Sequence, residues 1–401
     1  MRTYDIDQPI TFKRGVYQLN DNDGINFQLN RTVNWDGGRL KDVAAVSRSI
    51  HTIDDWKRAL IGLGDVAMSE DRVENAIGYY RMSEFLMRDD DPDKLAYYHK
   101  ARDLFYAYYA DYFAERDGAP AVVERLVAPY DGIELPVMHA RPEGTPSGTI
   151  VFHGGNDSYF EELFFPMLYL RERGYDVYLF EGPGQGSVLR DAGVVFTHEW
   201  ERPVAAVLDA FDLADVTIVG VSLGGYFAPR AAAFEKRISR VVAWTVFPSF
   251  LGAILSARPT LARMVARAAT TLHANRAIDA AFTKAAEKGD PSAQWVINHG
   301  VPAYGATTVS EYVQKLRAYD LAPVADKIDQ DILIIGASKD HFVDYTIVGD
   351  EIRMLRNVRS LTFRLMTEAE DACNHCSAGN TKLVMDTICQ WLAGLDVRDE
   401  G

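Results

Sequence analysis

Apolar residues in the first third of the chain recur at the spacing of α-helices. From about Ile53 to Glu115 they fall into three segments, and in the first of these Trp56, Leu60 and Leu63 share one helical face. Aromatic residues follow the same spacing in the second and third segments, which end near Met87 and Phe113. Such aromatics favour a bundle core or a contact surface over a cofactor site. The pattern predicts a helical N-terminal domain over residues 1–118.

The periodicity changes after Arg116–Gly118. Val122–Ala128 and Ile133–Ala140 flank a turn at Tyr130-Asp131-Gly132, which predicts an antiparallel hairpin. Short, continuously apolar segments follow, and helical stretches separate most of them. This arrangement is typical of an α/β domain with a mostly parallel sheet and helices on both faces. We predict this domain over residues 119–401, with strands at 149–152, 176–180, 216–221, 241–244, 332–335 and 361–363.

One interval between two predicted strands is too long for a single crossover helix. Nearly all of the stretch from about residue 247 to residue 325 has a helical pattern, as in Leu261–Val265, Ile278–Phe282 and Tyr312–Leu316. Ligands bind open α/β sheets at the carboxyl ends of the strands, where such an insertion would lie. We therefore predict a helical lid insertion over about 247–325.

The motif Gly220-Val221-Ser222-Leu223-Gly224 closes the apolar run 216–219 and precedes a helix-compatible segment. A strand, a sharp Gly-x-Ser-x-Gly turn and a helix form the nucleophile elbow of α/β-hydrolases. A serine hydroxyl reacts at neutral pH only when it is exposed beside a base, in a turn whose flanking positions have little room for side chains. We predict Ser222 as the nucleophile; the alternative is that Gly220, Gly224 and Gly225 only let the helix pack closely on the strand.

A serine nucleophile needs a base and an acid, which follow it in the order acid then histidine in this fold. His375 lies between the last predicted strand and the terminal helix, where the fold presents its base, and we prefer it to His341. The acid should follow the strand at 332–335. There the sequence offers Asp340 and Asp344, and we favour Asp340 because it is nearer the strand end.

Two backbone amides should bind the oxyanion that forms during attack. One is the N–H of Leu223, directly after the nucleophile, and the other comes from the loop after the first parallel strand. That loop reads His153-Gly154-Gly155-Asn156, and we choose the amide of Asn156 with Gly155 as the alternative. We expect His153 to pack within the loop.

Composition narrows the range of partners. The chain has 401 residues and a net charge of −15, so nucleic acid and anionic membrane surfaces should repel it, and we expect neither as a partner. The N-terminus lacks the apolar segment of a signal peptide and no membrane-length apolar run occurs, which predicts a cytoplasmic protein.

Of the three cysteines, Cys373 and Cys376 have the CxxC spacing of zinc sites, but a second pair is absent. We expect reduced thiols, no metal and no cofactor.

Several motifs together resemble one group of α/β-hydrolases. They are Gly154–Glu162, Phe180–Gly186, the turn around Ser222, and the pair His375-Cys376. The chain is similar in these motifs, and in its helical N-terminal segment, to the group of 2,6-dihydroxypseudooxynicotine hydrolase, the FrsA-like esterases and the yellowish-green polyketide-shortening hydrolases of fungi. It departs from that group at Phe160, where lysine is common.

The resemblance implies a serine hydrolase that cleaves a carbon–carbon bond beside a ketone in an aromatic or polyketide-like small molecule. The resemblance also leads us to expect that the protein forms a homodimer. A carboxylesterase or lactonase would use the same acyl chemistry and stays open as the alternative. A prolyl-oligopeptidase-type peptidase would carry a propeller, with which the helical segment is inconsistent. A non-catalytic binding protein of this fold would not need all three triad residues.

Overall fold

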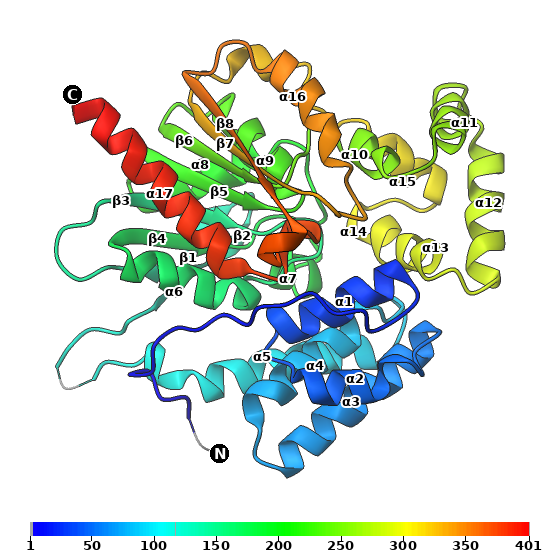
Figure 1. Cartoon of the computed structure of the whole chain (residues 1–401), viewed down its shortest axis with the longest axis horizontal. Helices are drawn as coiled ribbons and strands as arrows, with labels where there is room; N and C mark the ends of the chain where they lie inside the picture. The colour runs from blue at the N-terminus through cyan, green and yellow to red at the C-terminus, as the bar shows by residue number, and fades with distance from the viewer. Residues whose placement is uncertain (1–2, 117, 401) are drawn as a thin grey trace. The chain divides into compact units, whose positions relative to one another are not determined.

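The computed structural model describes residues 3–116 and 118–400 (Figure 1). By their contacts they form two compact units, one of residues 1–121 with 259–315 and the other of residues 122–258 with 316–401. Helices from the long interval at about 247–325 therefore occur in both units. The domain ranges expected from the sequence, 1–118 and 119–401 with the insertion, stay predictions.

The first unit is built on the helices that the apolar spacing predicted. Trp56, Tyr79 and Tyr80 are buried in their shared core, and the Trp56 indole N–H donates to the Met82 carbonyl at 2.6 Å. The aromatics of the first two segments are thus core residues, whereas Tyr97 and Tyr108 of the third are only partly buried. These helices are α3 (Ile53–Ser69), α4 (Val73–Phe85) and α5 (Asp93–Tyr108).

Two further helices, α1 (Asp23–Asn34) and α2 (Leu40–Ser47), were not predicted. In α1 the buried positions include polar residues, so the apolar pattern that marks a helix is interrupted. The buried amide of Asn30 accepts from Tyr17 N–H and donates to the Tyr17 carbonyl, both at 2.8 Å. Asn30 thus binds the segment before the helix through both backbone groups of Tyr17, which satisfies its buried amide.

The second part of this unit comes from residues 259–315. Trp295 of α13 packs against the core of the N-terminal helices, and α1 and α13 are in contact. Two segments that are far apart in the sequence, the N-terminal helices and α13, therefore contribute to the same hydrophobic core. The helices of this part are α11 (Thr260–Thr271), α12 (Asn275–Glu287), α13 (Pro291–Trp295) and α14 (Val301–Ala303), and α15 (Val309–Leu316) ends at the boundary of the unit.

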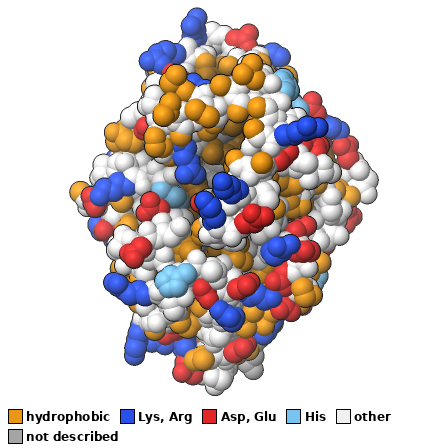
Figure 2. Space-filling view, turned by 90° about the vertical axis from the view of Figure 1, so that its right-hand side faces the viewer, with side chains coloured by type: hydrophobic (Ala, Val, Ile, Leu, Met, Phe, Trp, Pro, Cys, Tyr) orange, Lys and Arg blue, Asp and Glu red, His pale blue; other side chains and the backbone are white. Residues whose placement is uncertain are grey.

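Helix α11 turns its apolar side to the surface. Leu261, Met264, Val265 and Leu272 are 61–78% exposed, whereas Thr270 is buried. Exposed hydrophobic side chains are visible on the face shown in Figure 2. The polar side of α11 makes the contact inside the unit, where the Thr270 carbonyl accepts from the Gln314 side chain at 3.1 Å.

The second unit contains an eight-stranded sheet in the order β1-β2-β4-β3-β5-β6-β7-β8. The hairpin of β1 and β2 is antiparallel, and β2 also pairs antiparallel with β4, while all other pairs are parallel. This confirms the predicted hairpin and mostly parallel sheet. The strands are β1 (Glu124–Tyr130), β2 (Ile133–Ala140), β3 (Gly148–His153), β4 (Tyr175–Phe180), β5 (Val216–Val221), β6 (Ile238–Trp244), β7 (Asp331–Ala337) and β8 (Ser360–Met366).

Helices cover both faces of the sheet. On one side α6 (Phe164–Glu172) contacts α17 (Thr381–Glu400), which runs diagonally across the strands in Figure 1; on the other, α8 (Glu201–Ala210) contacts α9 (Gly224–Ala232). Shorter helices α7 (Gly186–Arg190), α10 (Phe250–Ser256) and α16 (Val348–Met354) lie in the connections. Because β3, β5, β7 and β8 are parallel, the loops that follow them leave the same edge of the sheet. No helix among residues 3–116 and 118–400 combines the length and apolar character needed to span a bilayer.

A carboxyl group lies fully buried beside this sheet. Glu351 of α16 accepts from Phe247 N–H through Oε2 at 3.2 Å, and Oε1 has no hydrogen-bond partner among the described residues. Burial raises the pKa of Glu351 from 4.5 to about 8, and the single amide hydrogen bond offsets this only partly. The folded protein therefore holds this carboxyl protonated at neutral pH.

We predict that Glu351→Gln stabilises the protein increasingly as pH rises from 5 to 8. Between pH 4.5 and 8 the folded state binds one more proton at Glu351 than the unfolded state, so the wild type loses stability with rising pH. Glutamine cannot ionise, and the difference should grow by up to about 1.4 kcal/mol per pH unit. Denaturant unfolding of both proteins across this range measures it; parallel stability curves would contradict the assignment.

Candidate active site

Ser222 occupies a strained turn between β5 and α9. Its φ is 60°, in the left-handed region that a residue with a side chain rarely adopts. The Ser222 N–H donates to the Trp244 carbonyl on β6 at 3.0 Å, which fixes the turn to the sheet. A Cβ on Gly220 would lie 2.3 Å from the Gly224 carbonyl oxygen, so the turn closes only with glycine there. Sequence and packing together hold the serine at the carboxyl end of a central strand.

A chain of two hydrogen bonds joins Ser222 to the predicted base and acid. Ser222 Oγ lies 2.8 Å from His375 Nε2, and His375 Nδ1 lies 2.7 Å from Asp340 Oδ2. His375 begins a short turn after β8, and Asp340 follows β7. The other carboxylate oxygen of Asp340 accepts from Phe342 N–H at 2.8 Å and Val343 N–H at 3.1 Å, which fixes its orientation.

The environment of His375 favours its charged form. Burial alone would lower the pKa of the imidazole, but the Asp340 carboxylate, by its charge and hydrogen bond, raises the pKa well above 6.5, with a smaller contribution from Cys376. Both side chains of the pair are nearly inaccessible to solvent. A proton that reaches His375 is therefore stabilised there.

Asp344, the other acid that the sequence offered, lies elsewhere. Its carboxylate accepts from the Thr346 N–H at 3.0 Å and the Thr346 hydroxyl at 2.8 Å, capping the turn Tyr345–Ile347. His341 packs its ring against Phe342. Of the two predicted acids, the structure brings only Asp340 to His375.

The loop after β3 lies directly against the Ser222 turn. A Cβ on Gly155 would stand 2.5 Å from the Val221 carbonyl oxygen, 2.7 Å from Ser222 Cβ and 2.8 Å from Leu223 N. The Gly155 N–H itself donates to Ser158 Oγ at 2.9 Å. That amide already has an acceptor, and Asn156 stays the predicted oxyanion donor of this loop.

The side chain of His153, at the end of β3 directly before this loop, lies in the protein interior. It is fully buried, its ring lies 5.3 Å from that of Trp200, and burial lowers its pKa to about 4. It is therefore neutral at physiological pH. These contacts are those of a packing residue.

Trp244 connects the serine turn to the histidine loop, a role that the sequence did not reveal. Its carbonyl accepts from Ser222 N–H, and its indole N–H donates to the Cys376 carbonyl at 2.9 Å. Cys376 and Ser377 both have positive φ values, 52° and 54°, so the loop that carries His375 is itself strained. In sequence, Trp244 is only one more apolar residue of a buried strand.

The loop after β4 supplies two more buried polar residues, Glu181 and Gln185. The Glu181 carboxylate accepts from Phe160 N–H at 3.1 Å and from the N–H and hydroxyl of Ser187, each at 2.9 Å. Gln185 accepts from Gly182 N–H at 2.9 Å and donates to the Gly155 carbonyl at 3.0 Å. The only sequence signal for them was the segment Phe180–Gly186, which the family resemblance singled out without giving its members roles.

The three cysteines are free thiols, and no set of three or more His, Cys, Asp or Glu side chains suited to a metal occurs in the described part of the chain.

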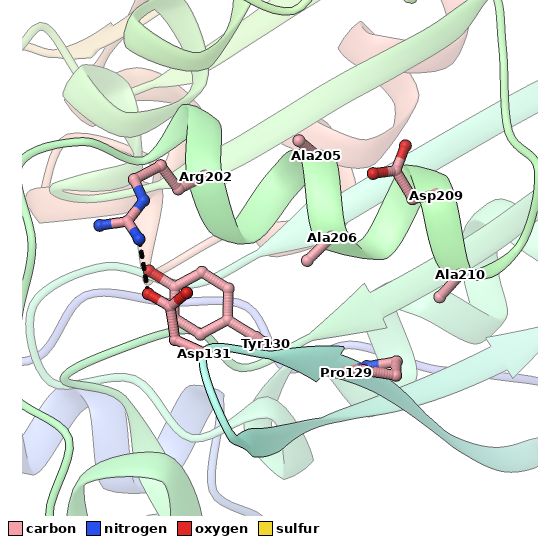
Figure 3. Close-up of a pocket in the computed structure, with 8 residues that line it drawn as sticks. All are labelled: Pro129, Tyr130, Asp131, Arg202, Ala205, Ala206, Asp209 and Ala210. Carbon is pink, nitrogen blue, oxygen red and sulfur yellow. Dashed lines mark hydrogen bonds and ion pairs between the residues drawn. The ribbon is translucent and has the colours of Figure 1, made fainter.

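An open hollow of about 530 Å³ lies between α8 and the turn after β1 (Figure 3). An ion pair between Arg202 and Asp131 at 2.6 Å crosses its rim. Its lining contains neither Ser222 nor the loops just described: Pro129, Tyr130, Asp131, Arg202, Ala205, Ala206, Asp209 and Ala210.

Comparison with known families decides the class of the chain. The family model described as the alpha/beta hydrolase fold matches residues 150–376, more than half of the sequence. The chain belongs to the α/β-hydrolase family. The predicted fold class is thereby confirmed, and this α/β-hydrolase is an enzyme of the hydrolase class.

Curated relatives of this α/β-hydrolase come from fungi. It is 30% identical over 315 residues to hydrolase acrC of Aspergillus aculeatus, covering 69% of this chain and 71% of that protein. It is also 30% identical over 266 residues to the alpha/beta hydrolase psoB of Aspergillus fumigatus, covering 59% of this chain and 57% of psoB. The match thus spans little more than half of psoB.

Solved structures show the same fold. The 2,6-dihydroxy-pseudo-oxynicotine hydrolase superposes with a TM-score of 0.59 at 20% identity, covering 90% of this chain and 94% of that one. AbyA5 superposes with a TM-score of 0.61 at 17% identity, covering 88% and 89%. Together with the family match and the curated hydrolases, these structures support the resemblance that the sequence motifs indicated. At these identities the structural likeness itself shows the fold alone.

Proposed function

We propose that this α/β-hydrolase uses Ser222, His375 and Asp340 as a catalytic triad to cleave a carbon–carbon bond beside a ketone in an aromatic or polyketide-like small molecule. The observation that supports the triad is the continuous hydrogen-bond chain from Ser222 Oγ through both ring nitrogens of His375 to Asp340. Geometry of this kind defines a triad independently of sequence position.

In the first half of the reaction, Ser222 Oγ attacks the ketone carbon while His375 Nε2 takes the hydroxyl proton. Asp340 holds the ring in the tautomer whose Nε2 accepts, and it stabilises the imidazolium that forms. The N–H groups of Leu223 and Asn156 would bind the negative oxygen of the tetrahedral adduct. The Ser222 turn and the Gly155 loop lie in contact, which supports this pairing of donors.

The adduct then collapses with cleavage of the carbon–carbon bond. The bonding electrons leave with the departing carbon, and His375 delivers its proton to that carbon. An electron-rich hydroxyaromatic ring would favour this step, because its hydroxyl groups make the departing ring carbon basic enough to take the His375 proton as the bond breaks, so that no free carbanion forms. Water, activated by His375, then hydrolyses the acyl ester on Ser222, which releases a carboxylic acid and restores the enzyme.

Support for the bond type comes from the sequence motifs that resemble the carbon–carbon hydrolase group. The curated relatives' names specify a hydrolase and no substrate. An ester or lactone would pass through the same acyl-enzyme on the same residues. The small-molecule substrate and the homodimer belong to the proposal as well.

We predict that an acyl-hydroxyaromatic ketone is cleaved to a carboxylic acid and the deacylated ring. Product analysis by mass spectrometry for matched ketone and aryl-ester substrates, together with prolyl peptides, measures the preference. Fast ester turnover without any ketone cleavage would overturn the bond assignment while leaving the triad in place.

We predict that Asp340→Asn lowers kcat by about ten-thousand-fold, because the imidazole loses the acceptor that fixes its tautomer. Asp344→Asn is the matched control. Its carboxylate only caps a turn, and asparagine caps as well, so its kcat should equal that of the wild type. A large loss in Asp344→Asn with none in Asp340→Asn would refute the assignment of the acid.

We predict an acidic limb in the pH profile of kcat/KM with a midpoint above 6.5, because attack requires neutral His375 and Asp340 raises the pKa of the imidazole. Protonation below this midpoint removes the base, so activity rises with pH. An NMR titration of His375 in Ser222→Ala should give the same high pKa, and adding Asp340→Asn should lower it. A His375 pKa that Asp340→Asn leaves unchanged would contradict this electrostatic account.

A further inference from the structure

The amide side chain of Gln185 links the loop after β4 to the loop that lies against Ser222. Gln185 is 1% exposed. Its Oε1 accepts from Gly182 N–H at 2.9 Å, and its Nε2 donates to the Gly155 carbonyl at 3.0 Å. Glutamine is suited to this position because one planar group supplies an acceptor and a donor at once.

The hydrogen bond to Gly155 acts on the amide of Asn156 through the peptide plane. The Gly155 carbonyl and the Asn156 N–H belong to the same peptide unit, and the described residues contain no cis peptide bond. In a trans unit these two groups point in opposite directions and rotate together. A donor that fixes the Gly155 carbonyl therefore also fixes the direction of the Asn156 N–H, on the side away from Gln185.

Gln185 is itself held firmly. Its N–H donates to the Gly182 carbonyl at 3.1 Å, and its carbonyl accepts from Leu189 N–H at 3.0 Å at the start of α7. A second hydrogen bond between the same two loops is donated by Phe160 N–H to the Glu181 carboxylate at 3.1 Å. The segment from Gly155 to Phe160 is thus hydrogen-bonded at both ends to the loop after β4.

We propose that Gln185 is a positioning residue that orients the Asn156 N–H toward the oxyanion of the Ser222 adduct. This inference rests on the proposed function. Gln185 touches neither Ser222 nor, in this account, the substrate. Its contribution should therefore grow as charge develops on the carbonyl oxygen, and so affect the transition state rather than substrate binding.

The test compares Gln185→Leu and Gln185→Glu with a matched control, Gln330→Leu. Gln330 is also buried, donates to the Ala232 carbonyl at 2.9 Å and accepts from Asp329 N–H at 3.0 Å, next to the amino end of β7. The two leucine variants remove the same kinds of hydrogen bond and should cost similar stability. Gln185→Glu can still accept from Gly182 but no longer donates to Gly155, and it provides a second variant should Gln185→Leu fold poorly.

We expect both Gln185 variants to lower kcat by about 10- to 100-fold with KM nearly unchanged, less than the 10²- to 10³-fold loss typical of removing an oxyanion donor outright. Affinity for an arylboronic acid, a mimic of the tetrahedral adduct, should fall by the same factor. Gln330→Leu should keep kcat and boronate affinity at wild-type values while losing similar thermal stability.

Two outcomes would overturn the positioning role. In the first, Gln185→Leu and Gln330→Leu lose stability alike and both keep their kcat; in the second, Gln185→Leu raises KM at constant kcat, as for a substrate contact. Ser222→Ala separates this from the proposed function. If Ser222→Ala turns over substrate as fast as wild type, the triad proposal fails; if it is inactive and the Gln185 variants are fully active, only the positioning role fails.

Discussion

The close approach of two loops at the carboxyl edge of the sheet determines the geometry of the site. The turn around Ser222 follows β5, the Gly155 loop follows β3, and these strands are direct neighbours. Gly155 lies so near the turn that a single methyl group there would overlap with the backbone of Val221 and Leu223. The positive φ of Ser222 persists because the sheet behind it and this loop beside it restrict the turn.

The same edge of the sheet carries Asp340 and His375, the acid and the base of the proposed triad. Asp340 is oriented by two backbone amides and fixes His375, whose ring reaches Ser222. Trp244 joins the remaining parts, since its carbonyl supports the serine turn and its indole supports the histidine loop. The loops after β5, β7 and β8 and the end of β6 are thus connected by hydrogen bonds that are largely closed to water, where such bonds are strongest. In the proposed mechanism this arrangement is in place before a substrate binds, which is what electrostatic stabilisation of a transition state requires.

The sequence predicted the parts of this arrangement that follow simple rules. The continuous apolar runs predicted the strands, and the positions of Ser222, Asp340 and His375 after three of these parallel strands placed them at one edge. It did not reveal α1, whose buried asparagines bind the extended N-terminal segment, or the outward apolar side of α11. Gln185 and Trp244 were missed for another reason: their roles depend on which loops meet in three dimensions, and a single glutamine or tryptophan in a chain carries no such information.

The central claim is that Ser222 is the nucleophile activated by His375. Peptide mapping after treatment with a fluorophosphonate tests it most directly, because this reagent forms a stable bond only with an activated serine. The account predicts stoichiometric modification of wild type at Ser222 and none in Ser222→Ala or His375→Ala. An unmodified wild-type protein, under conditions that label a control serine hydrolase, would contradict it.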